Sequence, residues 1–449
     1  MNKLISRLKF VYQYIISSIG FYPTLISFFF FCLAVVLLYL ERSGLSEQLL
    51  DTTFSFMIIS HGETAGLILS SITTGVISLT VFSFTMVMLV LNQASTNFSP
   101  RVIPGLISHK SNQAVMGLYL GTLIYTLVIM VNIRSESYSE SLPGFAIFLS
   151  MCFAIVCLGF FVYFIHAISQ SIQIGSILQE IYQMTSKSLD IQIKKDNKLK
   201  TSTAFEQADW VDLKSPQTGY LQSIDDKAVL RVCSEYDVVL DFEESLGSFL
   251  VEGVPFARVN RHLKDEDKLV EKLLDHVNFY REERPDLNYL FGFKHITESA
   301  VKALSPGIND PGTAIKAIEY LTALFSKRMQ LTDEKVICDK DGIARIRFKH
   351  ETFDNLLQEC LNPIRLYGKG NPEIVIRLLK MIKVLFYKAK DFPHLYSILR
   401  RVADQILFDA DKEVTNYGDR KTINVVIDAI NKRAKLSEFL PLLSDNYNE

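Results

Sequence analysis

Several kinds of functional site are missing from this sequence of 449 residues. Its six cysteines show no Cys-x-x-Cys spacing and its eight histidines form no His-Glu-x-x-His pattern. We therefore expect no metal and no cofactor, and we interpret the cysteines as free thiols. The formal net charge of -2 gives no basic surface for nucleic acid. We predict no cleaved signal peptide, because no small-residue cleavage site follows the long first apolar run.

Long apolar runs are what the sequence has in excess. Hydrophobic residues make up 49% of the chain, and the runs near 23–40, 66–91, 114–133 and 144–166 are each long enough to cross a bilayer as a helix. The rest of the chain has an ordinary soluble composition. We therefore predict a mainly α membrane protein, with four transmembrane helices followed by a cytoplasmic α+β region.

Changes in composition divide the chain into five predicted parts. They are an amphipathic N-terminal helix (1–20), a four-helix transmembrane domain (21–175), a helical extension and polar linker (176–214), a small β module (215–260) and a mostly helical cytoplasmic domain (261–449). The β module is similar to the barrel-sandwich modules of lipoyl and biotinyl carriers.

Basic residues near the ends of the spans predict the orientation. One side collects most of them, and the other has only Arg42 and Arg134; the first group is Lys3, Arg7, Lys9, Arg101, Lys110, Lys194 and Lys195. Cytoplasmic loops carry the excess of lysine and arginine in membrane proteins. Both termini are therefore predicted to be cytoplasmic.

The second span is unusually rich in hydroxyl groups. Written as heptads, one stripe consists of Ser71, Thr74, Ser78, Val81, Thr85, Met88 and Asn92. In an oligomer this stripe is a candidate pore lining, in which the polar groups replace part of an ion's hydration while Val81 and Met88 form an apolar gate. The alternative is that the hydroxyls bond to carbonyls of the preceding turn or to other helices. No aspartate, glutamate, lysine or arginine lies inside a predicted span, which argues against a proton-relay transporter.

Pairs of glycines four residues apart occur in two spans. Gly117 and Gly121 lie in the third, and Gly62 and Gly66 enter the second. Such pairs let helices approach closely, either within one four-helix subunit or between subunits.

A second group of candidate residues lies in the cytoplasmic region. It consists of Arg284, Asp286, Ser305, Gly307, Asn309, Asp310 and Thr313. Asp310 followed by Pro311 is typical of a helix start, so this segment is interpreted as a structural corner, with an anion site at the helix start as the alternative. A hydrolase requires a nucleophile paired with a base, or a metal cluster. The sequence shows neither, so we do not expect an enzyme.

Three blocks carry a resemblance to a known family. Residues 92–101, 215–259 and 304–314 look like those of a bacterial family of predicted membrane proteins, catalogued as a domain of unknown function. The resemblance implies bacterial origin, a four-span membrane region and a cytoplasmic C-terminal region. It brings no activity and no catalytic residues.

These observations together lead to three hypotheses. The first is an oligomeric inner-membrane protein with a channel-like conduit for a small ion, lined by the second span and gated by the cytoplasmic domain. The second is a non-conducting scaffold or sensor anchored in the membrane. The weakest is a cytoplasmic enzyme on a membrane anchor. The expected partners are the lipid bilayer, further copies of the chain and an unidentified cytoplasmic ligand, but no nucleic acid.

Overall fold

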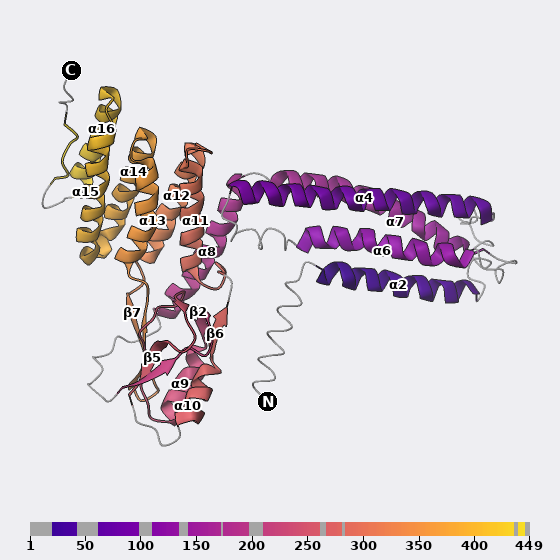
Figure 1. Cartoon of the computed structure of the whole chain (residues 1–449), viewed down its shortest axis with the longest axis horizontal. Coiled ribbons are helices and arrows are strands. Elements are labelled where there is room, and N and C mark those ends of the chain that lie inside the picture. The colour runs from indigo at the N-terminus through magenta and orange to yellow at the C-terminus, as the bar shows by residue number, and fades with distance from the viewer. Residues whose placement is uncertain are drawn as a thin grey trace. The chain divides into compact units, whose positions relative to one another are not determined.

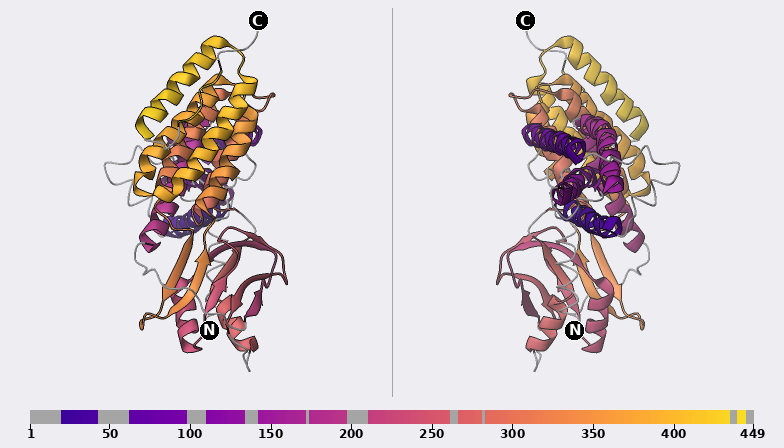
Figure 2. Two further views of the ribbon diagram at one scale, coloured as in Figure 1. Left: turned by 90° about the vertical axis from the view of Figure 1, so that its left-hand side faces the viewer. Right: turned by 90° about the vertical axis from the view of Figure 1, so that its right-hand side faces the viewer.

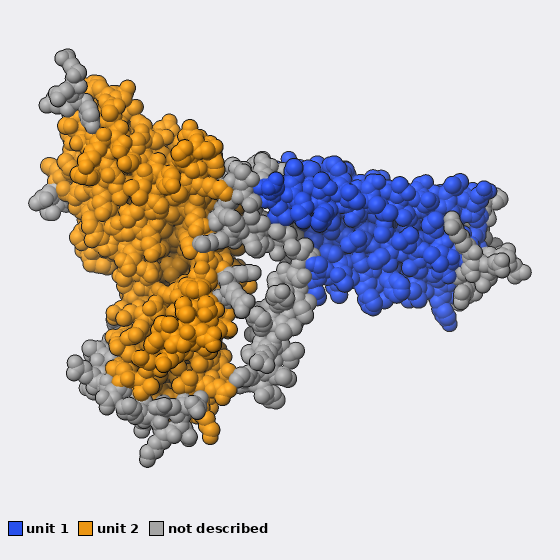
Figure 3. All heavy atoms as spheres, in the orientation of Figure 1, with its two compact units in different colours: residues 1–96, 102–173 blue, residues 97–101, 174–449 orange. Residues whose placement is uncertain are grey.

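The computed structural model describes residues 20–42, 62–97, 110–133, 142–171, 174–196, 210–260, 266–280, 283–434 and 439–444. The chain divides into two compact units (Figure 3), which we call the span unit (1–96 and 102–173) and the C-terminal unit (97–101 and 174–449). Except for Gly20, the predicted amphipathic helix at 1–20 lies outside the described residues.

The span unit contains four apolar helices (Figure 1). They are α2 (Phe21–Arg42), α4 (Gly62–Asn97), α6 (Lys110–Ile133) and α7 (Gly144–Ser171). Each is long and apolar enough to cross a membrane. The four predicted spans are therefore confirmed.

Helices α2 and α6 approach each other at the glycine pair of the third span. A Cβ atom added to Gly117 would lie 2.8 Å from Ile26 Cδ1, and one added to Gly121 would lie 2.8 Å from the Phe30 ring. These distances are too short for real Cβ contacts, so only glycine fits at both positions. This pair therefore packs two helices of the same chain. Gly66 of α4, in contrast, has nothing within 4 Å of an added Cβ.

A carboxylate, that of Glu41, lies at the end of α2. It directly follows the predicted first span, which was placed near residues 23–40. Glu41 is only 5% exposed and accepts hydrogen bonds from the backbone N–H groups of Phe145 and Ala146, both at 3.1 Å. The start of a helix carries free N–H groups and partial positive charge. Glu41 therefore caps α7 and ties it to the end of α2.

The C-terminal unit begins with α8 (Ile174–Asp196), which packs on α11 (Tyr289–Leu304) and α12 (Pro311–Arg328). A Cβ atom on Gly292 would lie 1.7 Å from Thr185 Oγ1. Lys327 Nζ lies 2.8 Å from the carboxylate of Asp190. Helix α8 thus continues to Asp196, within the predicted helical extension and linker (176–214).

Two sheets form the β part of this unit. The first has the order β1 (Val211–Lys214), β5 (Pro255–Val259), β3 (Leu240–Phe242), β8 (Ala344–Lys349) and β7 (Glu334–Cys338). The second has the order β4 (Phe249–Leu250), β2 (Gly219–Ile224) and β6 (Val277–Tyr280), and the helices α9 (Asp226–Glu235) and α10 (Glu266–Leu274) interrupt the strand sequence. The sheets therefore use strands from outside 215–260.

The remaining helices continue the C-terminal unit. They are α13 (Phe353–Gly368), α14 (Pro372–Lys388), α15 (Tyr396–Glu413) and α16 (Tyr417–Ala434), with short 3₁₀ turns at Ala389–Asp391 and Pro393–Leu395. Within this unit the helices from α11 onward gather at one end and the strands at the other (Figure 2). Strands β3 and β8 pair in parallel. This pairing joins the early strands β1, β5 and β3 to the later strands β8 and β7 in one sheet.

The close approach of α2 and α6 predicts that Gly121→Leu destabilises the span unit. Overpacking of this kind costs about 1–3 kcal/mol, because Phe30 and the backbone of α2 must move. We expect a lower thermal unfolding midpoint of the purified protein in detergent. The matched control is Gly159→Leu in α7, where an added Cβ meets nothing within 4 Å. Equal destabilisation by both substitutions would contradict the packing described here.

Candidate functional site

The polar stripe of α4 faces away from the other helices of the span unit. All seven stripe positions, Ser71, Thr74, Ser78, Val81, Thr85, Met88 and Asn92, are exposed. The exposed positions of α4 cover roughly half of the helix circumference, at 3.6 residues per turn, and the stripe runs along the middle of that half. The stripe is therefore the outermost line of α4 in a single chain.

The opposite side of α4 holds the helix against its unit. Ala65, Leu69 and Val76 are buried there, and at the edge of the exposed half Phe82 contacts Phe161 with ring centroids 5.6 Å apart. In the apolar stretch of α4 only 11% of the residues are buried, whereas 44% are buried in the apolar stretch of α6. Of the four spans, α4 is thus the one with the most surface left for lipid or for another chain.

The stripe hydroxyls donate their hydrogen bonds within α4. Ser71, Thr74 and Ser78 each donate to the carbonyl four residues earlier at 2.9 Å. Thr85 does the same at 2.8 Å. Each hydroxyl proton is therefore engaged by its own helix, while the oxygen keeps its acceptor capacity on the outer side.

The second predicted group forms a corner between α11 and α12. Asp310 accepts from the Thr313 N–H at 3.1 Å and from the Thr313 hydroxyl at 2.6 Å, which caps α12. Asn309 has a φ of 49°, a left-handed conformation that asparagine tolerates. Ser305 donates to the Lys302 carbonyl at 2.6 Å, and an added Cβ at Gly307 meets nothing within 4 Å. The aspartate carboxylate thus occupies one of the amides that an anion would use.

Arg284 and Asp286 are not part of this corner. They lie before α11, whereas the corner follows it, and a helix of 16 residues is about 24 Å long. Arg284 instead bonds Asp286 through two nitrogens, at 3.2 and 2.8 Å. The seven predicted residues therefore form two separate groups.

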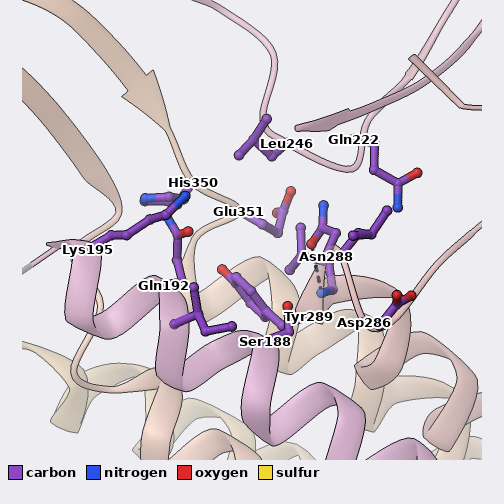
Figure 4. A pocket seen from close by; sticks show the side chains of 13 residues that line it. Ser188, Gln192, Lys195, Gln222, Leu246, Asp286, Asn288, Tyr289, His350 and Glu351 are labelled. Atoms are coloured by element: carbon purple, nitrogen blue, oxygen red, sulfur yellow. Dashed lines mark hydrogen bonds between the residues drawn. The ribbon is translucent and has the colours of Figure 1, made fainter. Parts of the chain in front are cut away.

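Asp286 borders a small pocket in the C-terminal unit (Figure 4). The cavity has a volume of about 220 Å³ between α8, the start of α11 and the segment after β8. In this view Asp286 lies apart from His350 and Lys195, on the other side of Asn288. Asn288 accepts from the Leu290 N–H at 3.0 Å and so caps α11. The pocket's polar groups thus serve, at least in part, to start that helix.

A buried carboxylate that the sequence did not single out lies beside α11. Glu283 is 4% exposed and lies 3.1 Å from His295 Nε2, 2.8 Å from Lys294 Nζ and 3.0 Å from the donating hydroxyl of Tyr220. Burial raises the pKa of the Glu283 carboxyl, but the hydrogen bonds from these partners outweigh it and lower the pKa to about 2. In the sequence, the only indication of this group was that His295 follows Glu283 within a short stretch. The fold, rather than a sequence motif, brings the other residues to Glu283.

The cap at the corner predicts a modest loss of stability in Asp310→Ala. Removing an aspartate cap costs about 1 kcal/mol, because two donors of the first turn lose their acceptor. We expect a lower thermal midpoint of the full chain, compared with Glu244→Ala in an exposed loop. If Asp310→Ala is as stable as that control, the corner does not depend on the cap.

Glu283 predicts a pH-dependent contribution to stability. Its pKa in the folded chain, about 2, lies below the usual 4.5, so the ionised form stabilises the fold. The contribution is complete above the usual pKa and is lost as the pH falls from about 4.5 toward 2. We therefore expect Glu283→Gln to be less stable than the wild type at neutral pH, with the difference shrinking between pH 6 and pH 3 in thermal unfolding. A difference that stays constant over this range would contradict the lowered pKa.

Comparison with known proteins gives the family. A family model described as a predicted membrane protein (DUF2254) matches residues 16–384. Uncharacterised proteins of Mycobacterium bovis and Mycobacterium tuberculosis are each 25% identical over 352 residues, which cover 76% of this chain and 67% of theirs. No solved structure matches the chain significantly. Since the family model covers most of the sequence, the chain belongs to this family of predicted membrane proteins, as the three sequence blocks implied.

Proposed function

We propose that the protein is an oligomer of the bacterial inner membrane in which copies of α4 line a conduit for small cations. The observation that carries the proposal is the exposed polar stripe in the middle of the least buried span. One helix cannot enclose a path, so several copies are needed around a common axis. Closed rotational symmetry is the usual arrangement of such assemblies.

The cost of exposing polar groups to lipid supports an oligomer. In a single chain the stripe would face hydrocarbon, including the amide of Asn92. Its hydroxyl protons are satisfied within the helix, but the outward oxygens gain nothing from lipid. Around a shared axis the same oxygens would contact water or ions instead.

The direction of the hydrogen bonds supports a preference for cations. Because the hydroxyls of Ser71, Thr74, Ser78 and Thr85 donate to carbonyls, they present acceptor oxygens outward. Oxygen acceptors replace the hydration shell of a cation but not that of an anion. The stripe carries no charged side chain, so this preference comes from dipoles alone.

Two apolar positions interrupt the polar stripe. Val81 is 60% exposed and Met88 is 47% exposed, and both lie on the same line as the hydroxyls. Facing copies of these side chains would form a constriction that closes by excluding water. We place the gate there and propose that the C-terminal unit, on the cytoplasmic side with both termini, controls it. A ligand of that unit shifts the gate only if it binds the open and closed states unequally.

A non-conducting sensor or scaffold is the second candidate. It is favoured by the internal bonding of the hydroxyls, which lets the stripe exist without any water beside it. In that case the span unit serves as an anchor for the C-terminal unit. We propose no catalytic role for Asp310, because its carboxylate is used as a helix cap.

The proposal is tested by ion flux into liposomes that contain the purified protein. We compare the wild type with Ser78→Phe on the stripe and with Ile77→Phe, the neighbouring exposed position about 100° around the helix. We expect the wild type to conduct potassium in preference to chloride. The flux through Ser78→Phe should fall about tenfold or more below that of the wild type, whereas Ile77→Phe should keep the wild-type flux. Oligomer size is measured for all three by chromatography in detergent.

Three results would contradict the conduit. They are the absence of flux even after deletion of residues 190–449 with the span unit still assembled, equal loss in both variants, and a preference for chloride. Loss of the oligomer alone in Ser78→Phe, without wild-type flux, would support the non-conducting candidate.

A further inference from the structure

The C-terminal unit contains a larger cleft than the pocket of Figure 4. Its volume is about 690 Å³, and it lies between α11, α13 and the loop before β4. We call it the α11–α13 cleft and define it by Tyr220, Phe291, Glu298, Val301, Glu359 and Pro363, with Glu351 at its edge. All of these residues belong to the C-terminal unit. Both helices present one face to the cleft, because its lining residues recur every three or four positions.

The loop over the cleft is fixed to the start of α11. Gly247 has a φ of 101°, and an added Cβ there would lie 2.9 Å from Asn288 Nδ2. Gly247 N–H donates to the Leu221 carbonyl at 2.7 Å. Only glycine fits both the conformation and the contact, so the loop has a defined position over the cleft. The cavity is therefore a built feature of the fold.

Acidic groups outnumber basic groups among the described residues of the lining. Three carboxylates, those of Glu298, Glu351 and Glu359, stand against the ammonium groups of Lys294 and Lys302. Lys294 is itself bound to Glu283 at 2.8 Å, outside the lining. Burial and the neighbouring Glu351 raise the pKa of the Glu359 carboxyl, while Lys294 opposes this. A cation in the cleft would therefore relieve the repulsion between carboxylates.

A proline inside α13 adds a further acceptor. Pro363 has no N–H group, so the carbonyl of Glu359 lacks the donor that a helix normally supplies four residues later. Pro363 and Glu359 both line the cleft. The lining thus offers carboxylate oxygens to a ligand that brings its own donors.

Aromatic rings also line the cleft. Tyr220 and Phe291 contact each other edge to face, with centroids 5.4 Å apart, and Tyr367 lies at the far end of α13. Aromatic faces attract cations and also cover apolar groups. Among the described residues no group of three His, Cys, Asp or Glu side chains is arranged for a metal ion. The lining therefore fits an organic cation better than a metal.

We propose that the α11–α13 cleft binds an organic cation in which a primary ammonium group is joined to an apolar, ring-sized body. The ammonium group donates to the carboxylates of Glu298 and Glu359, while the body lies against Tyr220 and Phe291. The proposal of this binding site does not depend on the proposed conduit, because a sensor and a gated channel would both use such a site.

The test is calorimetric titration of the full chain in detergent with phenethylamine, and with 3-phenylpropionate as the matched anion. Glu298→Gln combined with Glu359→Gln removes both charges while keeping the side-chain shapes. Val301→Trp fills the cleft from α11. Glu252→Gln, in an exposed loop outside the lining, is the control. Thermal unfolding establishes that each variant is folded.

We expect saturable binding of phenethylamine and none of 3-phenylpropionate. The double variant should weaken binding about fivefold or more, and Val301→Trp should abolish it. The control should bind as the wild type does. The proposal is overturned if the wild type does not bind the amine, if it binds the anion equally well, or if neither cleft variant changes the affinity. Should Val301→Trp not fold, the double variant decides. Flux measurements do not enter this test, so failure of the conduit leaves it unaffected.

Discussion

The hydrogen bond from a hydroxyl to the carbonyl four residues earlier is the interaction on which the membrane part of this account depends. Inside hydrocarbon every donor needs a partner, and α4 supplies partners for Ser71, Thr74, Ser78 and Thr85 from its own backbone. A polar stripe can therefore form on an exposed helix face without help from neighbouring helices. The same bonds turn the oxygens outward, which gives the stripe its expected preference for cations. Packing is provided elsewhere, by the glycine pair that brings α6 against α2.

Helix α11 has the corresponding role in the C-terminal unit. It contacts α8, α12 and α13, and its start and end are both fixed by polar side chains. Asn288 caps its first turn, and the Ser305 hydroxyl donates to the Lys302 carbonyl in its last turn. Between these ends one face holds His295 beside the buried Glu283, and another lines the α11–α13 cleft. Stability and the proposed binding site are thus properties of the same helix.

Local signals in the sequence predicted much of this structure. The four spans follow from apolar length, and the start of α12 follows from Asp310 and Pro311, whose effects act within one turn. Contacts between distant segments were not predictable. The capping of α7 by Glu41, the pairing of β6 with β2, and the parallel pairing of β3 with β8 all depend on partners far along the chain. The cleft was missed because its walls come from separate segments of the chain, within 220–248, 290–305 and 351–367, and carry no motif.

The central claim is that the stripe of α4 faces water in the assembled protein. It is tested most directly by single cysteines placed along α4 from Ser71 to Met88, in a chain without its six native cysteines. Each is exposed in liposomes to a charged, thiol-specific reagent that does not cross lipid. The account predicts fast modification at the stripe positions and slow modification at Ile77 and Phe84, repeating every 3.6 residues. If no position between Thr74 and Thr85 reacts while both ends of the helix do, the stripe faces lipid or a dry helix contact, and the conduit is wrong.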